Sequence, residues 1–160
     1  MLLYEKLNII EENTKGAPVL LKPITSGLGL KVYSSEFSDP ISGMIKKDSS
    51  SKSGYSIYVN RTHHKNRIRF TIAHEIAHLI LHQESIGDGV VDDAMYRSNL
   101  SSKMEREANN FAADLLMPWP LLSNILKKDN NVSVEILAEK FQVSKSTMSI
   151  RLRVPYETED

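Results

Sequence analysis

His74, Glu75 and His78 form an H-E-x-x-H array within the stretch Phe70–His82 of this 160-residue chain. The other residues of the stretch are mainly apolar or small, which predicts one helix that is buried on most sides. Histidines four residues apart lie on nearly the same helix face and can offer ring nitrogens to one metal ion. The next residue is rotated by about 100°, so Glu75 lies beside the ion, where a base that polarises a bound water must be.

A hydrolytic zinc site usually has three protein ligands and an open fourth position for water. The obvious third histidine, His82, lies eight residues beyond His74, which is about 12 Å along a helix axis. Nitrogens that share one zinc ion lie within about 4 Å of each other. His82 is therefore not a ready third ligand, and we expect it to pack beside the site or to contact a ligand from outside.

Two carboxylates on a second expected helix, residues 104–116, are better candidates for the third ligand. Glu105 and Glu107 are two residues apart and point to different sides, so only one of them can bind the metal. Asn109 follows Glu105 by one turn, where its side chain could orient a metal-bound histidine. Each carboxylate also has an ordinary explanation, because Glu105 fits a capping box that begins at Ser102 and Glu107 fits a solvated surface. The need of the first helix for a partner puts Glu105 ahead of Glu107, and both stay open.

The residues before the H-E-x-x-H helix predict short helices and a small antiparallel sheet, which together with that helix makes an α+β protein. The expected helices cover residues 2–10 and 19–26, and the expected strands cover 30–33, a segment from 43, and 55–59. Tyr55–Asn60 alternates apolar and polar residues as a half-buried strand does. If this strand lies at a sheet edge, it could receive an extended substrate by strand addition.

The second half of the chain is expected to be helical after a long connection. Residues 83–100 are a long connection for a compact domain, which favours a lid or a substrate-selecting loop. Helices are expected at 121–128, 134–141 and 145–152. The last two resemble a helix-turn-helix, but Gln142 replaces the usual turn glycine and few basic residues are nearby. The favoured interpretation is a helical hairpin that packs on the core through four apolar side chains, Leu137, Phe141, Met148 and Leu152.

A length of 160 residues indicates one domain. We expect it to be divided into N-terminal helices and sheet (1–66), metal-site helices (67–118), C-terminal helices (119–155) and a tail (156–160). Twenty basic residues balance twenty acidic ones, so we expect no direct binding of nucleic acid and no membrane partner. The absence of cysteine excludes a thiolate site and suits a reducing cytoplasm. The N-terminus lacks the apolar core of a signal peptide, and no run reaches the roughly 20 apolar residues of a membrane span.

Two segments, residues 69–82 and 105–118, together resemble the ImmA/IrrE family of metallopeptidases. The resemblance extends to Gly43 and to the strand 57–60. It implies a minimal zincin-like fold in which a small sheet packs on the H-E-x-x-H helix and a glutamate helix. It also implies that Zn²⁺ is bound by His74, His78 and Glu105, with Glu75 as the base. Several family members cleave or inactivate helix-turn-helix repressors in phage, mobile-element or stress-response circuits, so the resemblance implies that the partner is such a repressor or an antitoxin.

Two points stay open at this stage. The residue that stabilises the developing oxyanion is not identified, with Tyr58, Tyr96 and His82 as unranked candidates. The alternative function is a non-proteolytic DNA- or repressor-binding regulator whose metal site is structural or sensory.

Overall fold

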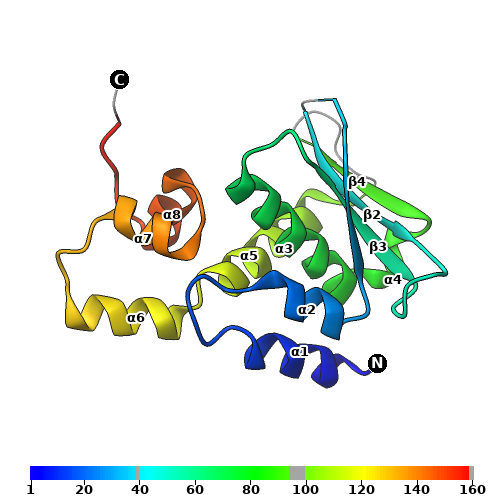
Figure 1. Ribbon diagram of the computed structural model, residues 1–160, viewed down its shortest axis with the longest axis horizontal. Helices are drawn as coiled ribbons and strands as arrows, with labels where there is room; N and C mark the ends of the chain where they lie inside the picture. Colours follow the sequence, from blue (N-terminus) through cyan, green and yellow to red (C-terminus); the bar gives the residue numbers. More distant parts are fainter. Residues whose placement is uncertain (39, 94–99, 159–160) are drawn as a thin grey trace.

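The helix that carries the H-E-x-x-H array, α3 (Lys65–Leu81), is flanked by a sheet and by a second long helix, α5 (Ser102–Leu116) (Figure 1). This arrangement is seen in a computed structural model that describes residues 1–38, 40–93 and 100–158. The strands are β1 (Lys31–Ser35), β2 (Ile41–Lys47), β3 (Tyr55–Asn60) and β4 (Gly89–Asp93). The remaining helices are α1 (Leu3–Glu12), α2 (Leu21–Gly27), α4 (Gln83–Ile86), α6 (Trp119–Lys128), α7 (Val134–Phe141) and α8 (Lys145–Leu152). The α+β class predicted from the sequence is confirmed.

The sheet has the strand order β1-β3-β2-β4 and is mixed. Strand β2 runs antiparallel to both β3 and β4, whereas β1 runs parallel to β3. The prediction of a wholly antiparallel sheet is therefore wrong for one pair, because β2 and β3 form a hairpin and β1 joins the free side of β3. This order also places β3 in the interior of the sheet, so the prediction that Tyr55–Asn60 could receive a substrate as an edge strand is wrong. The edges are β1 and β4.

One face of the sheet packs against α3 through side chains that alternate along the strands. Ile57 and Val59 of β3 are buried in the same apolar cluster as Ile76 and Leu79 of α3. The helix lies so close to β2 that a Cβ atom on Gly43 would stand 2.8 Å from the Cγ2 atom of Thr71. Glycine at this position therefore allows α3 and the sheet to approach each other.

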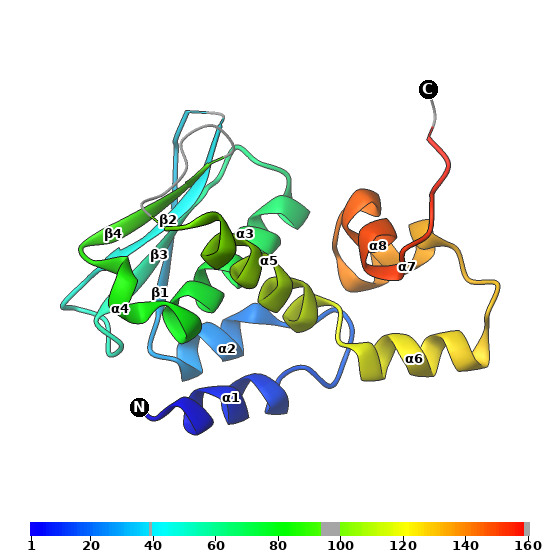
Figure 2. The same ribbon diagram turned by 180° about the vertical axis from the view of Figure 1, so that it is seen from behind.

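The last three helices lie at the end of the molecule opposite the sheet in both views (Figures 1 and 2). The side chains of Leu137, Phe141 and Met148 are fully buried, and Leu152 packs partly buried against the same cluster. The predicted packing of this helical hairpin is confirmed. Its turn is made by Gln142, which adopts a left-handed conformation with φ 55°, and the side chain of Arg69 on α3 donates hydrogen bonds to the carbonyl oxygens of Gln142 and Val19, at 3.3 and 2.8 Å.

The connection between α3 and α5 is more ordered than the sequence predicts. It contains the short helix α4 and the edge strand β4, which pairs with β2. Residues 94–99, which complete the predicted lid, lie outside the described residues. Across the described parts of the chain, every helix is too short or too polar to cross a bilayer.

Candidate metal centre

The array residues lie in the second half of α3, on its buried side. The helix begins at Lys65, and the ring nitrogen Nδ1 of His64 caps it by accepting the Asn66 backbone N–H at 3.1 Å. Glu75 and His78 have no exposed surface, and His74 is 7% exposed. Burying three polar side chains on one helix is costly unless they are bonded or coordinate a metal, so this segment is built around their interactions.

Donor atoms of three residues from α3 and α5 converge at one point. The Nε2 atoms of His74 and His78 are 3.0 Å apart. The Glu105 carboxylate places Oε2 3.1 Å from Nε2 of His74 and Oε1 3.1 Å from Nε2 of His78. One ligand atom from each residue lies within 4.8 Å of the others. The structure thus brings together the three residues that the sequence grouped as ligands.

These spacings suit a zinc ion. Donor atoms at about 2.1 Å from a tetrahedral zinc lie about 3.4 Å from each other, a few tenths of an ångström more than the separations seen here. Neutral imidazole nitrogens and a carboxylate oxygen are the ligand types that zinc takes in hydrolytic sites. The residues present therefore fit the metal that the sequence predicts.

Helix α5 supplies the carboxylate because its first turn faces the two histidines. Its N-cap is Ser101, whose hydroxyl accepts the Met104 backbone N–H at 3.2 Å. The capping box proposed from Ser102 is not formed, because the N-cap lies one residue earlier and the Glu105 carboxylate faces His74 and His78 instead.

The second nitrogen of each histidine also has a partner. Nδ1 of His74 lies 2.8 Å from Oδ1 of Asn109, the contact that the sequence suggested for this amide. Nδ1 of His78 lies 3.0 Å from Nδ1 of His82, which is itself 7% exposed. On its other side, Nε2 of His82 lies 3.5 Å from Oε1 of Glu107. Glu105 therefore faces the two central histidines, and Glu107 faces the third.

Burial lowers the pKa of His82 below its usual value, and the neighbouring His78 lowers it further, while Glu107 and Glu105 partly oppose both effects. Among the oxyanion candidates, Tyr58 stacks on Tyr33 with ring centroids 5.1 Å apart, and the Lys46 ammonium lies 4.6 Å from its centroid. The residues beside Tyr58 on β3, Ile57 and Val59, face the core and α3, so Tyr58 belongs to the opposite face of the sheet. Tyr96 lies outside the described residues.

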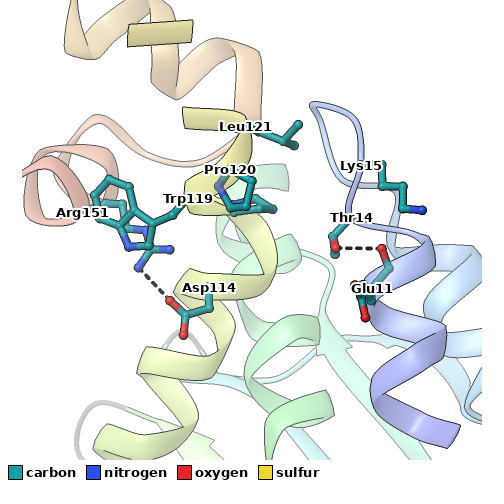
Figure 3. A pocket seen from close by; sticks show the side chains of 9 residues that line it. Glu11, Thr14, Lys15, Asp114, Trp119, Pro120, Leu121 and Arg151 are labelled. Carbon is teal, nitrogen blue, oxygen red and sulfur yellow. Dashed lines mark hydrogen bonds and ion pairs between the residues drawn. The ribbon is translucent and has the colours of Figure 1, made fainter. Parts of the chain in front are cut away.

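A cavity of about 630 Å³ that the sequence did not indicate lies away from this centre, between the end of α1 and the junction of α5 with α6. Figure 3 shows Arg151 of α8 beside Trp119 in its wall, with the guanidinium 4.4 Å from the ring centroid and 2.8 Å from the Asp114 carboxylate. Arg151 also donates to the carbonyl oxygen of Met117. These contacts fasten α8 to the junction, and the cavity contains none of the predicted site residues.

Comparison with known proteins places the site in a family. Residues 26–153 match the family model described as the IrrE N-terminal-like domain, a peptidase family designated M78. A segment of 93 residues is 32% identical to the radiation response metalloprotease IrrE of Deinococcus radiodurans. That segment is 57% of this chain and 28% of the relative, so the chain matches little more than a quarter of the relative's length. The family match covers most of the chain, including α3 and α5, and the chain therefore belongs to the ImmA/IrrE family of metallopeptidases.

Proposed function

We propose that this chain is a zinc-dependent endopeptidase in which His74, His78 and Glu105 hold the metal and Glu75 is the base. The observation that carries the proposal is the convergence of two Nε2 atoms and one carboxylate at 3.0 to 3.1 Å. Three protein ligands of these types leave a fourth position for water in hydrolytic zinc sites. Family membership supports the same reading.

Glu75 does the proton transfer in this proposal. His74, His78 and Glu105 would hold a zinc ion, which when bound would acidify water and polarise the carbonyl of the scissile peptide. Glu75 follows His74 directly and is fully buried, so it acts from beside the ligands in surroundings that bulk water does not screen. It accepts the proton of the attacking water and passes that proton to the leaving amine. Asn109 holds the His74 ring in the orientation that directs Nε2 to the metal.

The proposed substrate is a cytoplasmic protein, namely a helix-turn-helix repressor or an antitoxin. The family resemblance supports this substrate class. The name of the matched relative, a radiation response metalloprotease, supports only a role of a family peptidase in a stress response. A peptidase in such a circuit removes the repressor rather than competing with it for DNA. The gene next to that of this chain is the first place to seek the substrate.

The test compares wild type with Glu75→Gln on the repressor encoded beside this gene, with cleavage read as new termini by mass spectrometry. Glu12→Gln, an exposed change at the end of α1, is the matched control. We expect cleavage by wild type and by the control, and none by Glu75→Gln. Metal analysis should find about one zinc per chain that is lost in His78→Ala. Cleavage by Glu75→Gln at the wild-type rate, or a wild type that neither binds zinc nor cleaves, would refute the proposal.

The alternative is a regulator that binds DNA or a repressor without cutting it. Its natural element is the α7–α8 hairpin, whose basic residues are Lys140, Lys145, Arg151 and Arg153. Arg151 is already bonded to Asp114 and to the Met117 carbonyl, which leaves little positive charge for a phosphate backbone. A salt-dependent shift of duplex DNA by the full chain would favour this alternative.

A further inference from the structure

His82 directly follows the last turn of α3 and contacts a proposed metal ligand from the side away from the metal. It is 7% exposed, and its Nδ1 lies 3.0 Å from Nδ1 of His78. The two rings are tilted by 50° with centroids 5.2 Å apart, so the contact joins nitrogen to nitrogen and is not ring stacking. Two ring nitrogens at this distance share one hydrogen, and the position of that hydrogen follows from the rest of the site.

The hydrogen belongs to His78. Nε2 of His78 faces Nε2 of His74 and the Glu105 carboxylate, so in the metal-bound site Nε2 presents its lone pair. A neutral imidazole with a lone pair on Nε2 carries its hydrogen on Nδ1. His78 is then the donor to His82, and Nδ1 of His82 is the acceptor.

The same reasoning gives the position of the ring N–H hydrogen of His82 and identifies Glu107 as its neighbour. If Nδ1 of His82 accepts, its hydrogen lies on Nε2. That nitrogen is buried and lies 3.5 Å from Oε1 of Glu107. The three side chains therefore interact in series, in which His78 donates a hydrogen bond to His82 and His82 faces the carboxylate of Glu107.

We propose that His82 is a positioning residue that fixes the tautomer and the ring orientation of His78, and that Glu107 holds His82 in turn. The inference rests on the proposed metal site. His82 does for His78 what Asn109, at 2.8 Å, does for His74. Both carboxylates near the start of α5 are thereby used, Glu105 toward the metal and Glu107 toward His82. Partners of this kind typically change metal affinity by about 10- to 100-fold when they are removed.

Packing alone is the competing explanation, and two substitutions separate it from positioning. His82→Leu keeps an apolar side chain of similar size and removes the acceptor. His82→Asn shortens the side chain but places Oδ1 at the same number of bonds from Cα as the Nδ1 atom that it replaces. Positioning predicts that the asparagine variant resembles wild type, whereas packing predicts that the leucine variant does.

The experiment measures zinc affinity of the full chain by competition with a chromophoric chelator, together with thermal unfolding of each metal-free protein. We expect His82→Leu to bind zinc about 10- to 100-fold more weakly and His82→Asn to stay within about threefold of wild type. Glu107→Gln should weaken binding by only a few fold, because Glu107 is 47% exposed and exposed charges contribute little. The absorption bands of the cobalt-substituted protein should shift in His82→Leu and not in His82→Asn.

Ring ¹H–¹⁵N correlations of the zinc-loaded wild type test the proposed His78–His82–Glu107 contacts without any substitution. This test therefore applies even if His82→Leu does not fold. They should show the hydrogen on Nδ1 of His78 and on Nε2 of His82. A hydrogen on Nδ1 of His82, or equal zinc affinity in His82→Leu and wild type, would overturn the inference while the metal site stands. A wild type with no affinity for zinc would instead overturn the proposed function, and this inference with it.

Discussion

Gly43 on β2 sets how closely α3 approaches the sheet, and replacing it by alanine is the sharpest test of the packing described above. An added Cβ would lie 2.8 Å from Cγ2 of Thr71 and closer still to the carbonyl oxygen of Tyr58. The carbonyl belongs to the central strand β3, so it cannot move aside as the end of a flexible side chain can. The helix that carries His74 and His78 must then shift, or the β2–β3 pairing must distort.

The expected effect is destabilisation by about 1 to 3 kcal/mol, the usual cost of overpacking a core. In a chain of this size that corresponds to a fall in Tm of about 2 to 12 °C. The sign of this change in the free energy of unfolding is informative, because strand propensity alone would make the alanine variant more stable than wild type by roughly 0.5 to 1 kcal/mol. Urea unfolding followed by circular dichroism gives the free energy, and the zinc affinity of the folded variant reports whether α3 has moved.

Gly16→Ala is the matched control, since an added Cβ there meets no atom within 4 Å and the position does not have a positive φ. It should be neutral or slightly stabilising. Thr71→Ser in the Gly43→Ala background should recover part of the loss by removing Cγ2, while the contact with the Tyr58 carbonyl remains. Two results together would refute this account of the α3–sheet contact. The first is that Gly43→Ala is as stable as Gly16→Ala, and the second is that the effects of the Gly43 and Thr71 substitutions on the free energy of unfolding are additive.

Three further changes test the site and the hairpin loop. Glu105→Gln should abolish tight zinc binding because it removes the charged ligand, whereas Glu107→Gln should weaken binding only a few fold; the reverse order in a chelator competition would assign the ligand to Glu107. Asn109→Ala should weaken zinc binding by about 10- to 100-fold, and unchanged affinity by the same assay would mean that its 2.8 Å contact with His74 does not orient the ring. Hydrogen bonds from Ser50 and Ser56 lower the pKa of Asp48 from 3.8 to about 2, so Asp48 stabilises the fold above its ordinary pKa and loses this effect as the pH falls toward 2. The urea midpoint of Asp48→Asn should therefore lie below that of wild type at pH 6 and approach it at pH 3, and a gap that widens on acidification would contradict this.

Much of the helical framework could be predicted because its signals are local. The bounds of α7 and α8 follow the sequence prediction, since Ser133 and Ser144 cap them by accepting backbone N–H groups and each helix presents an apolar stripe. The paired motifs located α3 and α5 for the same reason. Gln142 shows the limit of the local rules, because the αL turn that usually takes glycine is made here by a glutamine whose carbonyl is held by Arg69.

The sheet topology could not be read in this way, because strand order is decided by contacts between distant segments. The alternation in Tyr55–Asn60 correctly identified a strand but suggested that only one of its faces is buried, whereas Ser56 and Asn60 on the other face are fully buried as well. It also did not tell whether both sides of the strand are paired. Strand β4 escaped notice because its sequence is short and acidic, and its pairing with β2 depends on the turn that α4 makes after α3. The sequence could thus name the strands before the key helix without giving their neighbours.

The two carboxylates of α5 show most clearly what spacing can and cannot decide. Side chains two residues apart point to different sides of a helix, which rightly indicated that Glu105 and Glu107 would not meet the same partner. It did not follow that the second carboxylate faces solvent alone, because the crossing of α5 over α3 brings it within 3.5 Å of His82. His82 was set aside as a ligand on its distance from His74, and that argument holds for the metal but not for His78, one turn away. His82, excluded from the metal, contacts the ligand His78, so the H-E-x-x-H array is better understood as a longer unit that ends at His82 and contacts α5 through Glu105, Glu107 and Asn109.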